Sequence, residues 1–98
     1  MEIKLMINGQ EKTFRNEFVS AKMLRKSFKI IDMMDELEDS STIDGETFDK
    51  INDYFVELYK NQFTAEEFEE GLAAKEYIIT VGDHIEEIVG VLGDDSKN

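Results

Sequence analysis

One stretch decides how this chain of 98 residues folds: Asn61-Gln62-Phe63-Thr64-Ala65-Glu66-Glu67-Phe68-Glu69-Glu70-Gly71-Leu72. Thr64 and Glu67 have the spacing of a capping box, in which each side chain accepts a hydrogen bond from the backbone N–H of the other residue. Phe63 and Phe68 flank the cap at the spacing of a hydrophobic staple. Gly71 is expected to end the helix in a left-handed conformation, which glycine adopts without strain. The stretch therefore predicts a short helix over residues 64–70.

One longer amphipathic helix is predicted on each side of this stretch. Before it, Asp44 caps a helix that ends near Asn61. The apolar side chains of that helix share one face, namely Phe48, Ile51, Tyr54, Phe55, Leu58 and Tyr59. After the stretch, a helix over residues 72–92 repeats the pattern and is expected to end at Gly93. Gly82 lies inside this last helix at a cost of roughly 1 kcal/mol relative to alanine, which indicates a close helix crossing or a mild bend.

The beginning of the chain predicts a β-hairpin. Ile3, Leu5 and Ile7 are spaced two residues apart, which is the period of a half-buried strand. Asn8-Gly9 follows, and both residue types tolerate the positive φ angles of a two-residue hairpin turn. Residues 11–15 are expected to return as the second strand. Because an isolated hairpin is only marginally stable, a helix must cover it.

A helix that begins at Ser20 is the expected cover. Val19 and Leu24 flank this cap at staple spacing. The apolar side chains of the helix occupy about half of its circumference, and they are Met23, Leu24, Phe28, Ile30, Ile31, Met34 and Leu37. A stripe of this width indicates contact with more than one element. Residues 38–45 then form a polar loop.

These elements together predict a single α+β domain over residues 1–93. In it, an N-terminal β-hairpin packs on a mainly helical domain of about four helices. Residues 94–98 are expected to form a frayed acidic tail at the C-terminus.

The net charge of −12 is unevenly distributed along the chain. Residues 1–31 hold seven Lys/Arg against three Glu, a balance of +4, whereas residues 32–98 hold four basic residues against twenty acidic ones, a balance of −16. The two halves either pack with complementary charges or offer a charged face to a partner. The overall sign disfavours nucleic-acid binding through phosphates. No apolar run approaches the roughly 20 residues that span a bilayer, so no membrane partner is expected.

The residue types that catalysis requires do not gather into a recognisable motif. The chain has no cysteine, and His84 is its only histidine, so no transition-metal cluster is expected. We interpret His84 as partly exposed and structural. The carboxylates lie on polar helix faces, where they are solvated. We therefore expect no enzymatic activity and no cofactor.

An apolar or aromatic surface is the functional feature that the sequence favours. The candidate partner-binding residues lie in or beside the short helix and on the helices around it, and they are Tyr54, Tyr59, Phe63, Phe68, Leu72 and Ile79. For each of them the competing interpretation is a place in the core. Ile79 points away from the apolar arc of its helix, so it is the residue most expected to be exposed.

Three segments of this chain, in their order and spacing, resemble a known family. They are Glu2-Ile-Lys-Leu-Met-Ile-Asn-Gly9, Phe18-Val-Ser-Ala-Lys-Met-Leu-Arg-Lys26, and Asn61-Gln-Phe-Thr64 leading to Gly71-Leu72. The chain is similar over about residues 1–80 to the tail assembly chaperones of long-tailed phages of Gram-positive bacteria, which resemble the G-type tail chaperones in role.

The resemblance implies a non-structural assembly factor in the host cytoplasm. Such a protein binds the tape measure protein, keeps it soluble and helps recruit the tail-tube (major tail) protein, and it is absent from the mature virion. The net charge is compatible with this role because it favours solubility. A client helix would then dock near residues 63–72 and against the second and fourth helices, and self-association is a further expectation.

Two alternatives from other classes stay open on the sequence alone. The −16 balance of residues 32–98 is compatible with an acidic DNA mimic that inhibits a nucleic-acid-binding protein, although the basic side of the first helix argues against it. The apolar patches are also compatible with a small adaptor that oligomerises.

Overall fold

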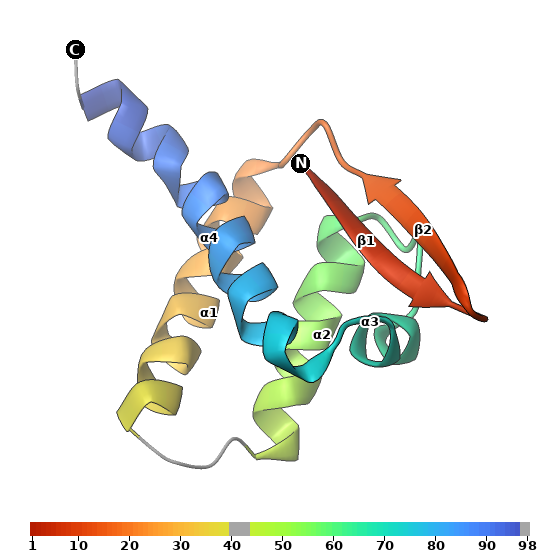
Figure 1. Ribbon diagram of the computed structural model, residues 1–98. Coiled ribbons are helices and arrows are strands. Elements are labelled where there is room, and N and C mark those ends of the chain that lie inside the picture. Colours follow the sequence, from red (N-terminus) through yellow and green to blue (C-terminus); the bar gives the residue numbers. More distant parts are fainter. Residues whose placement is uncertain (40–43, 97–98) are drawn as a thin grey trace.

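A computed structural model describes residues 1–39 and 44–96, with side chains for residues 1–35 and 44–90. The elements follow in the order β1 (Glu2–Ile7), β2 (Gln10–Arg15), α1 (Ala21–Asp39), α2 (Gly45–Leu58), α3 (Ala65–Gly71) and α4 (Ala74–Ser96) (Figure 1). The predicted α+β class, with an N-terminal hairpin and four helices, is confirmed. The predicted polar loop falls mostly on residues 40–43, which lie outside the described residues.

The hairpin forms as its turn sequence predicts. Asn8 and Gly9 have φ angles of 53° and 79°, both in the left-handed region. The strands pair antiparallel with Ile7 opposite Gln10 and Ile3 opposite Phe14. Ile3 and Leu5 are buried, so this register turns the apolar side of β1 toward the helices.

The turn from α2 into α3 is fixed by local interactions. Lys60 and Asn61 adopt left-handed φ angles of 56° and 62°, which reverse the chain after α2. The predicted capping box is present, because Thr64 Oγ1 accepts from Glu67 N at 3.0 Å and Glu67 Oε1 accepts from Thr64 N at 2.9 Å. The staple is also present, with the rings of Phe63 and Phe68 stacked at 5.8 Å between centroids.

A cluster of aromatic rings forms the centre of the core. Phe68 stacks on Phe55 of α2 at 4.8 Å, and Phe63 meets Phe14 of β2 edge-on at 5.1 Å. Tyr77 of α4 packs against the edge of Phe68 at 5.7 Å. Through Phe68, α3 contacts α2 and α4, and Phe63, which precedes α3, contacts the hairpin. Helix α3 thus lies beside α2 and against β1 (Figure 1).

Gly71 has a different role from the predicted one. It is the last residue of α3, and its φ angle is not positive, so it is not a left-handed cap. A Cβ atom at this position would lie 2.9 Å from Leu5 Cβ and 3.2 Å from the backbone oxygen of Met6. Glycine is therefore required here because α3 approaches β1 too closely for a side chain.

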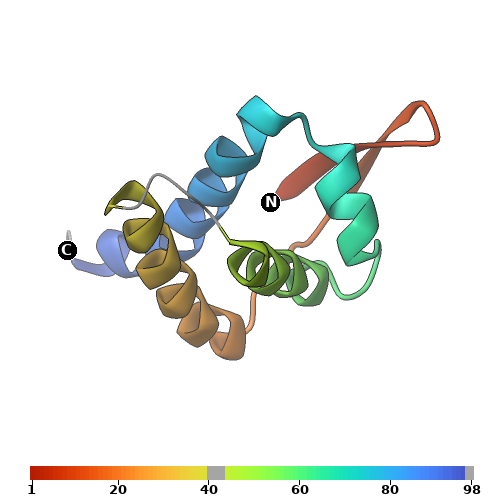
Figure 2. The same ribbon diagram turned by 90° about the horizontal axis from the view of Figure 1, so that it is seen from below.

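Helix α1 packs against both α2 and α4 (Figure 2). Lys22 and Lys26 of α1 form ion pairs with Glu57 of α2 at 2.9 and 2.6 Å. Their hydrogen bonds lower the pKa of Glu57 below its usual range. Part of the basic charge of residues 1–31 is thus paired within the domain, as one of the two interpretations of the charge asymmetry predicts.

Helix α4 differs from its prediction at its end and at Gly82. It continues to Ser96 instead of ending near Gly93, and its last turns extend beyond the body of the domain (Figure 1). A Cβ at Gly82 would lie 3.7 Å from Met34 Cε of α1, an ordinary contact distance. The crossing of α1 and α4 therefore does not require glycine. In the part of the chain that the structure describes, no helix combines the length and apolar character of a membrane span.

Replacing Gly71 with alanine is expected to lower the free energy of unfolding by about 1–3 kcal/mol, because the added methyl group overpacks the contact between α3 and β1. Gly82→Ala is the matched control. It is expected to raise the free energy of unfolding by about 0.5–1 kcal/mol, since it removes a helical glycine where a methyl group fits. Chemical denaturation followed by circular dichroism measures both, and a Gly71→Ala protein as stable as the wild type would contradict this packing.

Candidate partner-binding surface

The six predicted partner-binding residues divide into core and surface. Four of them are buried in the core of the folded domain, as the competing interpretation predicts, namely Tyr54, Tyr59, Phe63 and Phe68. Leu72 is half-buried between α3 and α4, and Ile79 on α4 is 61% exposed. The predicted exposure of Ile79 is confirmed. Only Leu72 and Ile79 therefore have surface that a partner can touch without opening the core.

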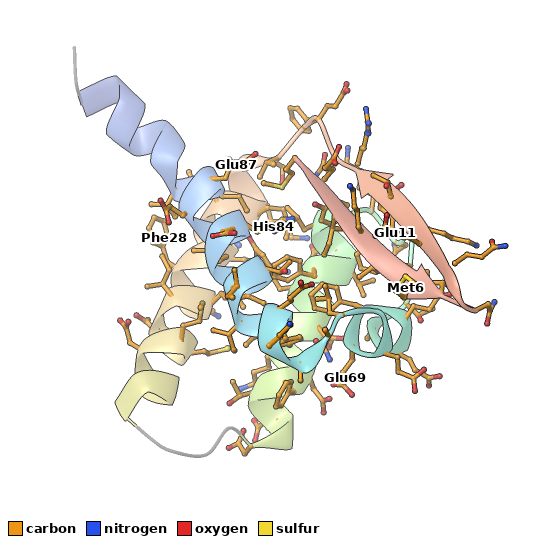
Figure 3. The ribbon with its side chains drawn as sticks, viewed as in Figure 1. Met6, Glu11, Phe28, Glu69, His84 and Glu87 are labelled. Atoms are coloured by element: carbon orange, nitrogen blue, oxygen red, sulfur yellow. The ribbon has the colours of Figure 1, made fainter. Side chains whose placement is uncertain are left out.

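Other apolar side chains are exposed that the sequence did not single out. They are Met6, Phe18, Phe28 and Ile78. Met6 lies on the hairpin and Phe28 on α1, on separate sides of the molecule (Figure 3). The ammonium group of Lys60 lies over the ring of Phe18, with its Nζ 5.4 Å from the ring centroid. Phe28 lies at the edge of the wide apolar stripe of α1. The width of this stripe is the sequence feature from which its exposure could have been predicted.

The buried tyrosines anchor the helices through their hydroxyl groups. Tyr54 donates to the backbone oxygen of Met23 at 3.1 Å, and Tyr77 donates to Asn52 Oδ1 at 2.7 Å. Asn52 in turn donates to Glu69 Oε1 at 2.8 Å, which links α4, α2 and α3. Burial raises the pKa of Tyr54 to about 12. These hydroxyls thus stay protonated donors, and their role is structural.

His84 is structural, as predicted, but it is buried instead of partly exposed. Only 8% of its surface is exposed. Its Nδ1 lies 2.9 Å from the backbone oxygen of Thr80, and because a carbonyl only accepts, Nδ1 carries the proton. Its Nε2 then accepts from the hydroxyl of Tyr59 at 2.6 Å. Burial lowers the pKa of His84 below its ordinary 6.5, although Glu87 and Asp83 oppose this effect.

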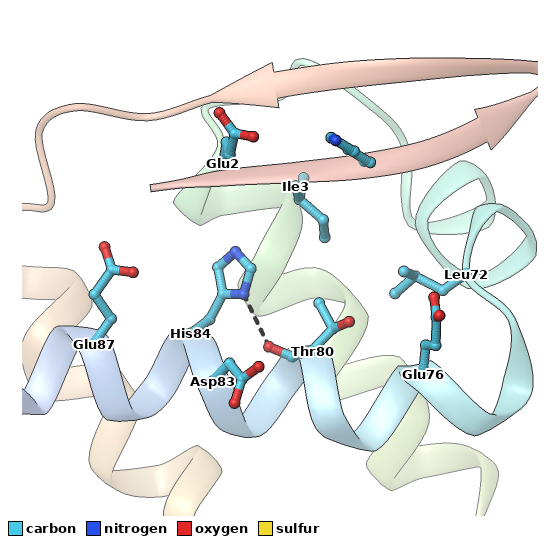
Figure 4. Close-up of a pocket in the computed structure, with 9 residues that line it drawn as sticks. Glu2, Ile3, Leu72, Glu76, Thr80, Asp83, His84 and Glu87 are labelled. Atoms are coloured by element: carbon cyan, nitrogen blue, oxygen red, sulfur yellow. Dashed lines mark hydrogen bonds between the residues drawn. The ribbon is translucent and has the colours of Figure 1, made fainter.

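Two open hollows adjoin at Leu72, and together we call them the Leu72 groove. The first, of about 360 Å³, lies between β1 and α4, with Ile3 on the β1 side and Thr80 and His84 on the α4 side (Figure 4). The second, of about 550 Å³, lies where α2, α3 and α4 meet, with Phe48 and Tyr77 in its wall. Leu72 lines both hollows and lies at the junction of α3 and α4.

The rim of the Leu72 groove is strongly acidic. Six carboxylates line the two hollows, namely Glu2, Asp49, Glu69, Glu76, Asp83 and Glu87, and Lys4 is the one cation that lines them. Glu76, Asp83 and Glu87 follow at spacings of seven and four residues, which places them on one face of α4 (Figure 4). Within the described residues, no ion pair reaches Asp49, Glu76 or Asp83.

The two hollows thus combine apolar and polar side chains with a rim of carboxylates. Among the described residues, no group of three or more His, Cys, Asp or Glu side chains is placed to hold a metal ion. The model of a family described as phage tail chaperone protein matches residues 1–98. This chain belongs to that phage tail chaperone family. Neither a curated protein nor a solved structure matches it.

Membership in the phage tail chaperone family confirms the resemblance that the three segments suggested. The role of this family is in tail assembly. The Gram-positive host and the individual partners of the chaperone stay predictions. The acidic DNA mimic and the plain adaptor gain no support from the family match.

The single histidine of this tail chaperone gives a direct test of the buried Tyr59–His84 contact. We expect His84 to titrate below pH 6.5, because burial disfavours the imidazolium. Below pH 6.5 the unfolded state binds a proton at His84 more readily than the folded state does. The contribution of neutral His84 to the free energy of unfolding is therefore fully present above pH 6.5 and is lost as the pH falls toward the pKa of the folded state. Nuclear magnetic resonance of the imidazole measures the pKa, and denaturation at several pH values measures the stability.

His84→Gln is the control for this titration. The difference in stability between wild type and His84→Gln should shrink as the pH falls below 6.5, whereas it should be constant above that value. An imidazole that titrates at or above its ordinary pKa would contradict the buried neutral state.

Proposed function

We propose that this protein is a tail assembly chaperone that binds the tape measure protein, keeps it soluble and helps recruit tail-tube subunits. It acts in the host cytoplasm and is absent from the mature virion. The observation that carries this proposal is the family match over residues 1–98. The finer roles follow from the resemblance of the three sequence segments.

The surface of the domain supports a role in holding an apolar client. Leu72 and Ile79 offer accessible apolar surface, and Ile78 lies beside Ile79 on α4. The net charge of −12 keeps copies of the protein apart, which helps a protein that exposes apolar side chains to stay in solution. Of the predicted partner-binding residues, we therefore propose Leu72 and Ile79 as contacts, and we assign Tyr54, Tyr59, Phe63 and Phe68 to the core that positions them.

Co-expression tests this function. We expect the tape measure protein from the same phage genome to be largely insoluble when expressed alone and to move to the soluble fraction with this chaperone. The two proteins should then co-purify. If the tape measure protein is equally insoluble with and without the chaperone, and no complex can be isolated, the proposed function is wrong.

Ile79→Ser is expected to reduce the co-purified tape measure protein about fivefold or more, because it removes an exposed apolar contact worth roughly 1 kcal/mol or more. Thermal unfolding should be nearly unchanged, since Ile79 is 61% exposed. Met6→Ser is the matched control, because Met6 is 51% exposed on the hairpin, away from α4. Equal losses in the two variants would argue against a specific contact at Ile79.

A further inference from the structure

We infer that the Leu72 groove binds one amphipathic helix of the client, whose apolar stripe is flanked by Lys and Arg side chains. This inference rests on the proposed function and names the chemistry of the segment that the chaperone recognises. It combines three features of the groove: the apolar side chains that line it, its position along α4, and a rim on which three carboxylates have no ion-pair partner within the described residues.

The floor of the groove selects for apolar side chains. Ile3 and Leu72 contribute to the first hollow, and Leu72, Phe48 and Tyr77 to the second. The open volumes of about 360 and 550 Å³ are large enough for side chains of a partner to enter. Leu72 is only half-buried, so part of its surface is left for such a side chain to cover.

The length of the groove fits a helix. Tyr77 in one hollow and His84 in the other are seven residues apart on α4, which corresponds to roughly 10 Å along the helix axis. Two turns of a client helix span the same distance, so its side chains at positions i and i+7 can enter the two hollows.

The rim selects for positive charge. The six carboxylates come from four elements, with Glu2 on β1, Asp49 on α2, Glu69 on α3 and Glu76, Asp83 and Glu87 on α4. Glu87 lies 3.8 Å from the N-terminal ammonium group. Glu2 pairs with Arg15 at 3.4 Å and Glu69 accepts from Asn52, whereas no cation within the described residues pairs with Asp49, Glu76 or Asp83. Lys and Arg flanking the apolar stripe of a client would neutralise this field, and a client with acidic flanks would be repelled.

Overlapping synthetic peptides that tile the tape measure protein test the inference. Fluorescence titration should find that the tightest peptides form helices with apolar residues two turns apart and with Lys or Arg on both sides of the stripe. Their affinity should fall as salt is raised, because the rim charges are exposed and therefore screened. Tightest binding by acidic or uncharged peptides would overturn the proposal.

Two charge-reversed variants locate the site. Glu76→Lys/Asp83→Lys should weaken the binding of these peptides about tenfold or more, because the reversal makes two attractive contacts repulsive. Asp32→Lys/Asp35→Lys changes the net charge equally on the exposed side of α1 and should weaken binding less than about threefold. The neutral variant Glu76→Gln/Asp83→Asn should be intermediate, and thermal unfolding shows whether each variant is folded.

A charge swap completes the test. A peptide whose flanking Lys and Arg are changed to Glu should bind Glu76→Lys/Asp83→Lys better than the wild type. If the tape measure protein binds the wild type and the rim variant equally, the groove assignment is wrong and the proposed function stands. If it binds neither, the proposed function fails as well. Self-association of the wild type that the rim variant abolishes would assign the groove to a second copy and overturn the inference.

Discussion

The stack of Phe55, Phe68 and Phe63 is the interaction on which the rest of this fold depends. A helix of seven residues such as α3 is not stable alone in water, because nucleation costs more than so few hydrogen bonds return. Burial of each large side chain contributes about 1.5–3 kcal/mol, so the stack holds α3 against α2. With α3 fixed, its last residue, Gly71, meets β1 directly, and the hairpin gains the support that two strands lack by themselves.

The same stack determines which side chains are left for a partner. Because the aromatic rings of the staple face inward, the surface near α3 consists of Leu72 and of the carboxylates around it. The buried polar groups beneath that surface are all paired, and within the described side chains no buried nitrogen or oxygen lacks a hydrogen bond. The Tyr59–His84 and Tyr77–Asn52 hydrogen bonds fix the side chains of His84 and Tyr77 in the Leu72 groove. A preformed site of this kind would lose less entropy on binding a partner.

The sequence predicted the parts of this fold that local interactions determine. The Asn8-Gly9 turn, the caps at Asp44 and Thr64 and the Phe63–Phe68 staple all form as expected, because each depends on residues no more than five positions apart. Tertiary packing decided the rest. The closeness of Gly71 to Leu5 and the burial of His84 both depend on contacts between distant segments, and no local pattern reports them. Aromatic residues at helical spacing likewise do not reveal whether a partner or the core covers them.

An acidic rim around an apolar floor also suits a protein that must let its client go. Exposed apolar surface alone would bind any unfolded chain and other copies of the chaperone. The carboxylates disfavour association between copies, and against a basic client they act mainly by increasing the rate of encounter. Because such rim contacts are solvated, they add little to the barrier against dissociation. If the proposed complex forms, apolar contacts as few as those of Leu72 and Ile79 make it reversible, so that a growing tail can take the tape measure protein from the chaperone.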